Sequence, residues 1–139
     1  MILLDTNVIS EPWKPAPNTC VLTWLDAQAI ETLFISAISI AELRFGIASM
    51  PAGKRQTILS DRLEGEVLPI FDGRILPFNV GTPQFYAELM AGGRRSGKAI
   101  GKADGYIAAT AAENHLTVAT RDTSPFEAAG LKVINPWVA

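Results

Sequence analysis

Five short runs of apolar residues recur along the chain. They are nearly continuous instead of alternating with polar residues, which is typical of strands covered on both faces of a parallel sheet. We therefore expect five strands in a mostly parallel sheet. The runs span Ile2–Leu4, Leu33–Ser36, Ile75–Phe78, Thr117–Thr120 and Lys132–Ile134.

Segments with helical spacing lie between these runs. The alternation of strands and helices predicts an α/β fold, a three-layer α/β/α sandwich with a central, mostly parallel five-stranded sheet. A chain of 139 residues fits a single domain over positions 1–139. The expected helices are one capped by Asn18, one opened by Ser39 with the stripe Ile40, Leu43, Ile47 and Met50, and four over residues 54–67, 82–95, 102–114 and 124–129.

Composition narrows the class of protein only slightly. The hydrophobic fraction of 48% and the charged fraction of 19% are those of an ordinary globular protein. Cys20 is the only cysteine, no apolar run approaches a membrane span, and no secretory signal is visible, so we expect a cytoplasmic protein. The net charge of −2 does not by itself indicate a nucleic-acid binder, although acids that hold metal ions would leave the rest of the surface less acidic.

Four carboxylates stand where expected strands and helices begin or end: Asp5, Glu42, Asp104 and Asp122. Ligands of open α/β sheets bind beyond the carboxyl ends of the strands. Oxygen-only ligands suit Mg²⁺ or Mn²⁺ and not zinc. The four acids together therefore indicate a hard-metal site. With one histidine, His115, and one cysteine, the chain favours neither structural zinc nor a serine or cysteine nucleophile.

Two of these acids have a purely structural alternative at helix starts. Asp5 follows the first strand and can cap a short helix of Asn7, Val8 and Ile9. Glu42 follows Ser39 by three residues, the S-x-x-E spacing of a capping box. For Glu42 alone, the capping role is the stronger interpretation.

The other two acids differ in how easily structure explains them. Asp104 shares a helical face with apolar residues, and an isolated buried charge is costly, so pairing or metal ligation is expected there. The flanking Gly101 and Gly105 indicate a close approach by substrate or by another backbone. Asp122 can instead cap the helix at 124–129 or pair with Arg121.

The ordered set of motifs resembles the PIN-domain ribonucleases, most closely the VapC-like toxins of type II toxin–antitoxin systems and their FitB-like branch. The resemblance extends from Met1 to the end of the chain. It rests on Asp5-Thr6-Asn7 after the first strand, Ala41-Glu42-Leu43, the run from Ala103-Asp104-Gly105 to Ala111, and Ala119-Thr120-Arg121-Asp122.

The resemblance implies a toxin that is a metal-dependent endoribonuclease using Mg²⁺ or Mn²⁺. Asp5 and Asp104 would be the main ligands, Glu42 and Asp122 would complete the site directly or through water, and Thr120 would supply the hydroxyl of the family's motif. Products would carry a 5′-phosphate and a 3′-hydroxyl. The resemblance also implies a homodimer and a cognate antitoxin that blocks the site, commonly with a basic side chain.

Substrate and partner contacts are less sharply indicated. Basic residues near the acids could contact RNA phosphates, although an ordinary solvated face explains them equally well. Trp13, Trp24, Leu25 and the proline-rich segment 11–17 could form an apolar antitoxin groove, and a role in the core or as a lid is the simpler interpretation. The basic candidates are Arg94, Arg95, Lys98, Lys102 and Arg121.

Two other functions compete with the ribonuclease. A haloacid-dehalogenase-like phosphatase also places an aspartate after the first strand, but it needs a second one two residues later, where this chain has Asn7. A non-catalytic α/β binding module of the receiver type would need an acidic pair that the chain lacks. The nuclease is therefore the favoured hypothesis.

Overall fold

A five-stranded, all-parallel sheet forms the centre of the molecule. The computed structural model describes all residues, 1–139. The spatial order of the strands is β3-β2-β1-β4-β5, and every neighbouring pair is parallel. The predicted sheet is thus confirmed. The strands are β1 (Ile2–Leu4), β2 (Leu33–Ser36), β3 (Ile75–Leu76), β4 (Thr117–Ala119) and β5 (Val133–Ile134).

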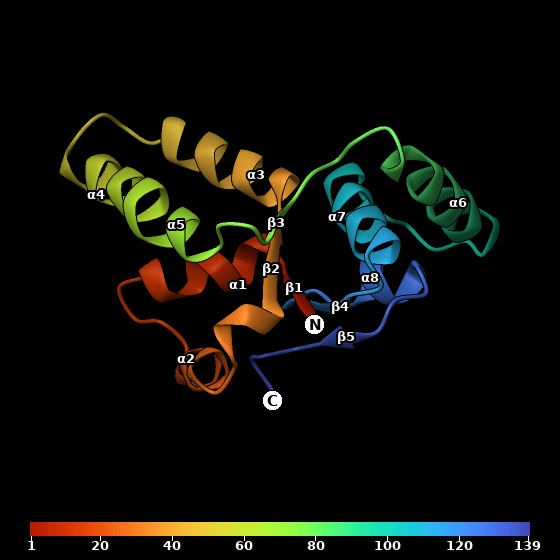
Figure 1. Ribbon diagram of the computed structural model, residues 1–139, viewed down its shortest axis with the longest axis horizontal. Helices are drawn as coiled ribbons and strands as arrows, with labels where there is room; N and C mark the ends of the chain where they lie inside the picture. Colours follow the sequence, from red (N-terminus) through yellow and green to blue (C-terminus); the bar gives the residue numbers. More distant parts are fainter.

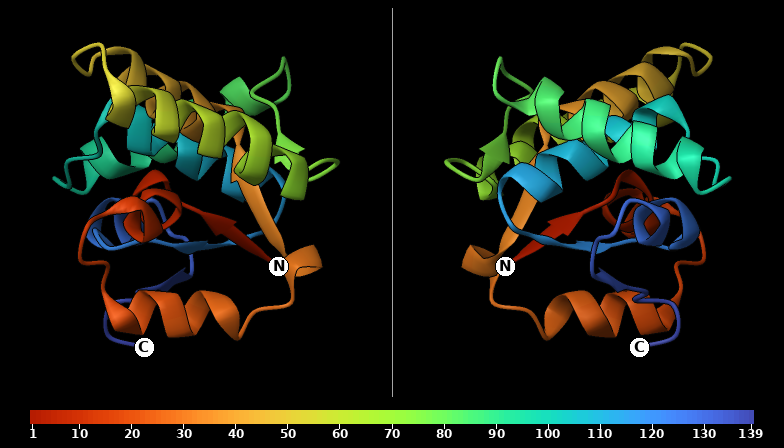
Figure 2. Two further views of the ribbon diagram at one scale, coloured as in Figure 1. Left: turned by 90° about the vertical axis from the view of Figure 1, so that its left-hand side faces the viewer. Right: turned by 90° about the vertical axis from the view of Figure 1, so that its right-hand side faces the viewer.

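Helices cover both faces of this sheet (Figure 1). They are α1 (Thr6–Ser10), α2 (Thr19–Asp26), α3 (Ala37–Ala48), α4 (Lys54–Arg62), α5 (Leu68–Ile70), α6 (Thr82–Arg95), α7 (Lys102–Glu113) and α8 (Ser124–Ala128), with short turns η1 (Glu11–Trp13), η2 (Ile30–Thr32) and the π-helical η3 (Leu63–Val67). The helices α1 to α5 lie on one side of the sheet and α6, α7 and α8 on the other; α3 and α4 are nearest in the left view of Figure 2, and α6 and α7 in the right view. The expected three layers are present.

The order of the strands decides where a site can form. The chain proceeds from β1 outward to β2 and β3, and then returns to the opposite side of β1 with β4 and β5. The direction of winding therefore reverses between β1 and β4, the place where open α/β sheets bind ligands. In register, Leu4 of β1 lies beside Ala119 of β4, so the residues that follow these two strands emerge side by side.

Several predicted boundaries shift in the structure for local reasons. β3 ends at Leu76, because Pro77 has no N–H to donate to a neighbouring strand. The polar helix expected over 54–67 begins at Lys54 as predicted but continues through η3 into α5. At this junction the Leu68 N–H bonds to the Leu63 carbonyl five residues back. Pro69 follows directly, so the regular bonding pattern could not have continued in any case.

The core consists of two apolar clusters separated by the central strands. One is centred on β1, β2, α1 and α3 and includes Leu4, Val8, Ile35 and Leu43. The other packs α7 and α8 against Leu3 and Val118. Both clusters hold the central strands rigid beneath their carboxyl ends. None of the helices has the length and apolar character needed to cross a bilayer. The second cluster is Leu3, Ile107, Ala108, Ala111, Leu116, Val118 and Phe126.

Candidate metal centre

Asp5 lies at the carboxyl end of the central strand, and its carboxylate is held on both oxygens. Its backbone N–H donates to the Ala119 carbonyl at 2.9 Å, which continues the pairing of β1 with β4. The Thr120 hydroxyl donates to Oδ2 at 2.8 Å, and the Thr6 N–H donates to Oδ1 at 2.8 Å. The residue is only 6% exposed. Thr120 thus orients Asp5, and Asp5 also serves as the N-cap of α1, so the cap and the site share one side chain.

The environment of Asp5 disfavours its charge. Burial raises the pKa of this carboxyl to about 6, although the hydrogen bonds from Thr120 and Thr6 oppose the rise. The negative charges of Asp104 and Glu42 add to it. A carboxylate placed in this way gains strongly from a nearby cation, because a cation removes both the desolvation penalty and the repulsion.

Glu42 does not make the capping box that its spacing suggests. α3 begins three residues earlier than expected, because Ser36 and not Ser39 caps it, by accepting from the Ser39 N–H at 3.0 Å. The prediction that Ser39 opens the helix is therefore wrong, and the Glu42 side chain is free for another role. Its Oε1 accepts a hydrogen bond from the Thr6 hydroxyl at 2.7 Å, which brings it to the carboxyl end of β1.

Asp104 lies in the first turn of α7 and is partly buried. Burial raises the pKa of its carboxyl, and the charges of Asp122 and Glu42 raise it further. The two glycines beside it have different explanations. A Cβ on Gly105 would lie 2.7 Å from the Met90 sulfur, so this glycine permits α6 to pack on α7. A Cβ on Gly101 would meet only the Asp104 carboxylate, at 3.8 Å.

Asp122 is exposed, and neither structural alternative explains it. The N-cap position of α8 is occupied by Thr123, whose side chain makes no capping hydrogen bond. Arg121 does not pair with Asp122, since its guanidinium lies 5.5 Å from the centre of the Trp137 ring. The Ser124 hydroxyl donates to the Asp122 carboxylate at a long 3.4 Å. Asp122 is therefore available to a ligand.

The donor chemistry of the four acids fits a hard divalent cation. None of them forms an ion pair, because the two ion pairs of the molecule are Lys14–Glu11 and Arg44–Glu64. Instead, the charges of Asp104 and Glu42 add to the rise in the pKa of the Asp5 carboxyl, and those of Asp122 and Glu42 add to that of Asp104. No three acidic, histidine or cysteine side chains lie in an arrangement that would hold an ion between them without other ligands. Mg²⁺ needs no such arrangement, because proteins usually hold it with one or two carboxylates and several waters.

One side chain of this centre, Thr6, is not among the site residues predicted from the sequence. Thr6 contacts both Asp5, through its N–H, and Glu42, through its hydroxyl. Its place in the Asp5-Thr6-Asn7 triplet was the only available signal. Asn7 accepts from the Arg121 N–H at 3.4 Å and so links the segments that follow β1 and β4.

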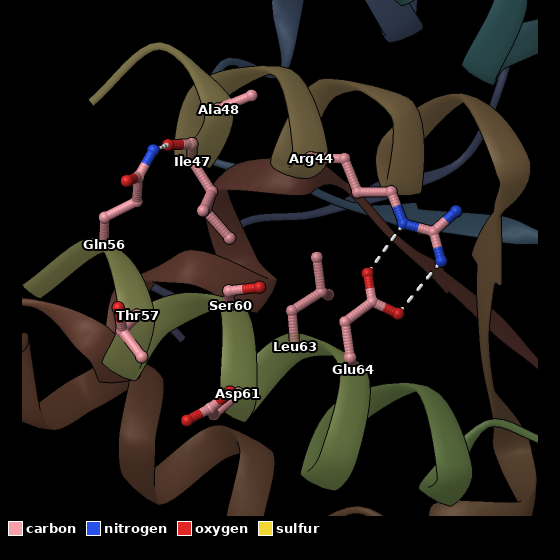
Figure 3. Close-up of a pocket in the computed structure, with 9 residues that line it drawn as sticks. All are labelled: Arg44, Ile47, Ala48, Gln56, Thr57, Ser60, Asp61, Leu63 and Glu64. Carbon is pink, nitrogen blue, oxygen red and sulfur yellow. Dashed lines mark hydrogen bonds and ion pairs between the residues drawn. The ribbon is translucent and has the colours of Figure 1, made fainter. Parts of the chain in front are cut away.

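Two hollows of the surface lie outside the acidic centre. Figure 3 shows one of about 350 Å³ between α3 and α4, where Arg44 and Glu64 make a two-point ion pair at 2.8 and 3.0 Å. It contains none of the four acids. A second hollow, of about 520 Å³, lies where α6 turns toward α7, and Arg94 and Lys98 line it with four apolar residues.

The remaining candidates occupy two kinds of position. Trp13, Trp24 and Leu25 are partly buried and pack against the first core cluster, in agreement with the simpler interpretation of a role in the core. The basic candidates lie at the end of α6, on the segment before α7, at the start of α7 and after β4. They are Arg94, Arg95, Lys98, Lys102 and Arg121, all of them exposed and without an ion pair.

Comparisons with known proteins agree with this geometry. The PIN domain model matches residues 2–131. The VapC ribonuclease Y4jK of Sinorhizobium fredii is 67% identical over 99% of this chain and 98% of its own length. The crystal structure of FitAcB from Neisseria gonorrhoeae superposes with a TM-score of 0.97 at 52% identity and covers 100% of both chains. VapBC-5 of Mycobacterium tuberculosis, a member of the VapBC family of toxin-antitoxin systems, has a TM-score of 0.70 at 25% identity over 96% of each chain.

A family match that extends over most of the chain leaves no ambiguity about the fold. The two relatives above 50% identity cover nearly the whole length, so the similarity is not confined to one motif. The chain belongs to the PIN-domain family.

Proposed function

We propose that the protein is a metal-dependent endoribonuclease and the toxin component of a type II toxin–antitoxin system. The observation that carries the proposal is the group of four carboxylates without cationic partners at the switch point between β1 and β4. The 67% identity to a VapC ribonuclease supports RNA cleavage as the reaction at these carboxylates. The whole catalytic site would lie in the single domain formed by residues 1–139.

Each acid has a role that follows from its surroundings. Asp5 and Asp104, whose carboxyl pKa values are raised, would be the main ligands, and Glu42 and Asp122 would complete the site directly or through water. Thr120 orients Asp5 through its hydroxyl. When bound, a divalent ion supplies Lewis acidity that activates water and neutralises charge on the scissile phosphate. Hydrolysis would leave a 5′-phosphate and a 3′-hydroxyl.

Metal removal tests the proposal directly. Cleavage of a mixed RNA substrate should disappear in excess chelator and return on addition of Mg²⁺ or Mn²⁺, because the four acids offer only hard oxygen donors. Mg²⁺ and Mn²⁺ are expected to work better than Zn²⁺. Full cleavage in excess chelator would exclude a metal-dependent nuclease, whatever the protein's other properties.

The basic residues near the acids would hold the RNA strand. Arg94 and Lys98 line one hollow, and Lys102 begins the helix that carries Asp104; Arg95 and Arg121 are exposed close by. Replacing both Arg94 and Lys98 by alanine should raise KM and lower the salt dependence of RNA binding, by about 1.4 in the slope of log K against log salt for two lost phosphate contacts.

The matched control for this pair is Lys54→Ala with Arg62→Ala, which removes two exposed charges from α4. Affinity should be measured by fluorescence anisotropy with single-stranded RNA at several salt concentrations. If both double variants change the slope equally, the effect comes from net charge and the proposed contacts are absent.

The family similarity supports further partners. An antitoxin would cover the acidic centre, and a basic side chain is the natural group to place among four unpaired acids. A second copy of the chain would form a homodimer; Phe45 on α3, 74% exposed, supports such a contact. Light scattering of the wild type and Phe45→Glu tests the dimer, and co-purification with the neighbouring gene product tests the antitoxin. An RNA-cutting toxin would act in the cytoplasm, with Mg²⁺ or Mn²⁺ as its metal cofactor.

The two competing hypotheses receive no support. The position at which a haloacid-dehalogenase-like phosphatase needs its second aspartate is Asn7, whose amide oxygen accepts from the Arg121 N–H. A non-catalytic binding module would not require four unpaired acids at one sheet edge.

A further inference from the structure

Glu42 is the member of the acidic group that the fold itself controls least. It lies on the exposed side of α3, while its neighbour Leu43 is buried. A glutamate has a long side chain that loses much rotamer freedom when it is fixed. The single hydrogen bond that its carboxylate makes is the 2.7 Å bond from the Thr6 hydroxyl, 36 positions away in the sequence.

We propose that Thr6 is a positioning residue that holds the Glu42 carboxylate in the metal centre. This inference rests on the proposed function. The hydroxyl donates to Oε1, so Oε2 makes no hydrogen bond within the protein. Such a bond restricts the orientation of the carboxylate, as the partners of metal-ligating carboxylates commonly do.

The position of Thr6 suits this task. It is the first residue of α1, directly after the central strand, and its own N–H donates to the Asp5 carboxylate at 2.8 Å. One residue therefore links two acids, Asp5 directly after β1 and Glu42 on α3. Threonine is β-branched and stiff at its first side-chain torsion, so its hydroxyl has few alternative directions.

The arrangement mirrors the bond between Thr120 and Asp5. Thr120 donates from the end of β4 to Asp5 at 2.8 Å, and Thr6 donates from the start of α1 to Glu42 at 2.7 Å. Two of the four acids thus have a threonine hydroxyl on one oxygen. For Asp5 this bond is buried, whereas for Glu42 it is exposed and competes with water, so the stiffness of Thr6 matters more.

A purely structural link between α1 and α3 is the competing explanation. Those helices already pack through buried side chains of the first core cluster, among them Val8 and Leu43. An exposed hydrogen bond adds little to such a contact. A structural role and a positioning role make different predictions for metal binding, which can be measured without RNA.

The experiment is calorimetric titration of the full chain with Mn²⁺ alone. Thr6→Val keeps the shape and removes the hydroxyl, and it should weaken Mn²⁺ binding by about 10- to 100-fold, the range found for partners of metal ligands. Thr6→Ser keeps the hydroxyl and should stay within about threefold of the wild type. Thr57→Val is the matched control, because the hydroxyl of Thr57 on α4 donates to the Gly53 carbonyl and to none of the four acids.

A double-mutant cycle separates positioning from general damage. In a Glu42→Gln background, Thr6→Val should weaken Mn²⁺ binding much less than it does in the wild type, because the carboxylate it would position is gone. Should Thr6→Val fail to fold, Thr6→Ala supports the same comparison.

Three results would overturn the inference. They are wild-type affinity in Thr6→Val, equal losses in the valine and serine variants, and equal effects of Thr6→Val with and without Glu42. Absence of Mn²⁺ binding by the wild-type protein itself would instead refute the proposed metal centre, so the two failures can be distinguished.

Discussion

Replacement of Asp104 by asparagine should lower kcat/KM for RNA cleavage by about a thousandfold or more while the fold survives, and Asp5→Asn should do the same. A bound divalent ion contributes several kcal/mol of charge stabilisation to phosphoryl chemistry. Each 1.36 kcal/mol corresponds to about one factor of ten in rate. Both side chains lie where burial and neighbouring acids disfavour their charge, so a cation is the natural counterpart of each carboxylate. The neutral amide of asparagine is a poor substitute for such a carboxylate.

The measurement is gel-based cleavage of RNA with Mn²⁺, together with far-UV circular dichroism and thermal unfolding of each variant. Asp72→Asn is a suitable control, since Asp72 is an exposed carboxylate in the turn before β3 and makes no side-chain hydrogen bond. Its activity should equal that of the wild type. Residual cleavage near the wild-type rate in both Asp5→Asn and Asp104→Asn would exclude these residues as the principal ligands.

The second large effect is a dependence of stability on pH that originates in Asp5. Its pKa is raised from 3.8 to about 6 in the folded protein. Between these values the folded state binds the proton more tightly than the unfolded state does, so the free energy of unfolding should fall as the pH rises from about 4 to about 6. The full penalty, about 3 kcal/mol, should then persist at neutral pH without metal. Asp104, whose pKa is also raised, acts in the same direction.

Urea unfolding in a chelator at pH 4.5, 6 and 7.5 measures this dependence. Asp5→Asn should flatten the profile and make the metal-free protein more stable at pH 7.5, because the amide carries no charge to desolvate. Mn²⁺ should stabilise the wild type more than the variant, by binding the folded state alone. Parallel pH profiles for the wild type and Asp5→Asn would show that burial of this carboxylate has little energetic consequence.

Local patterns in the sequence predicted most of the fold. Continuous apolar runs predicted the five parallel strands, and Asn18 was correctly identified as a helix cap that accepts from the N–H groups of Cys20 and Val21. Such features depend on a few adjacent residues and therefore survive without tertiary information. Ser39 was chosen incorrectly because two serines compete: Ser36 and Ser39 both have capping chemistry, and the end of β2 decides between them.

The acidic residues themselves were also accessible from the sequence. Asp104 lies on an otherwise apolar helical face, and Asp5 and Asp122 follow strands, so their positions were unusual enough to notice. The role of Gly105 was not accessible, because the residues that require it, Tyr86 and Met90, come from another helix. The sequence indicated a close approach but could not say by what.

The sequence by itself determined the elements, their parallel arrangement and the four acids that follow them, because hydrophobic periodicity and residue chemistry act over short distances. Only the tertiary structure decided what each acid contacts. The bond from Thr6 to Glu42 and the bond from Thr120 to Asp5 join residues 36 and 115 positions apart, respectively. Such pairs meet only once the order of the strands places β1 between β2 and β4. No local pattern encodes that order, since it results from how all the helices pack on the sheet.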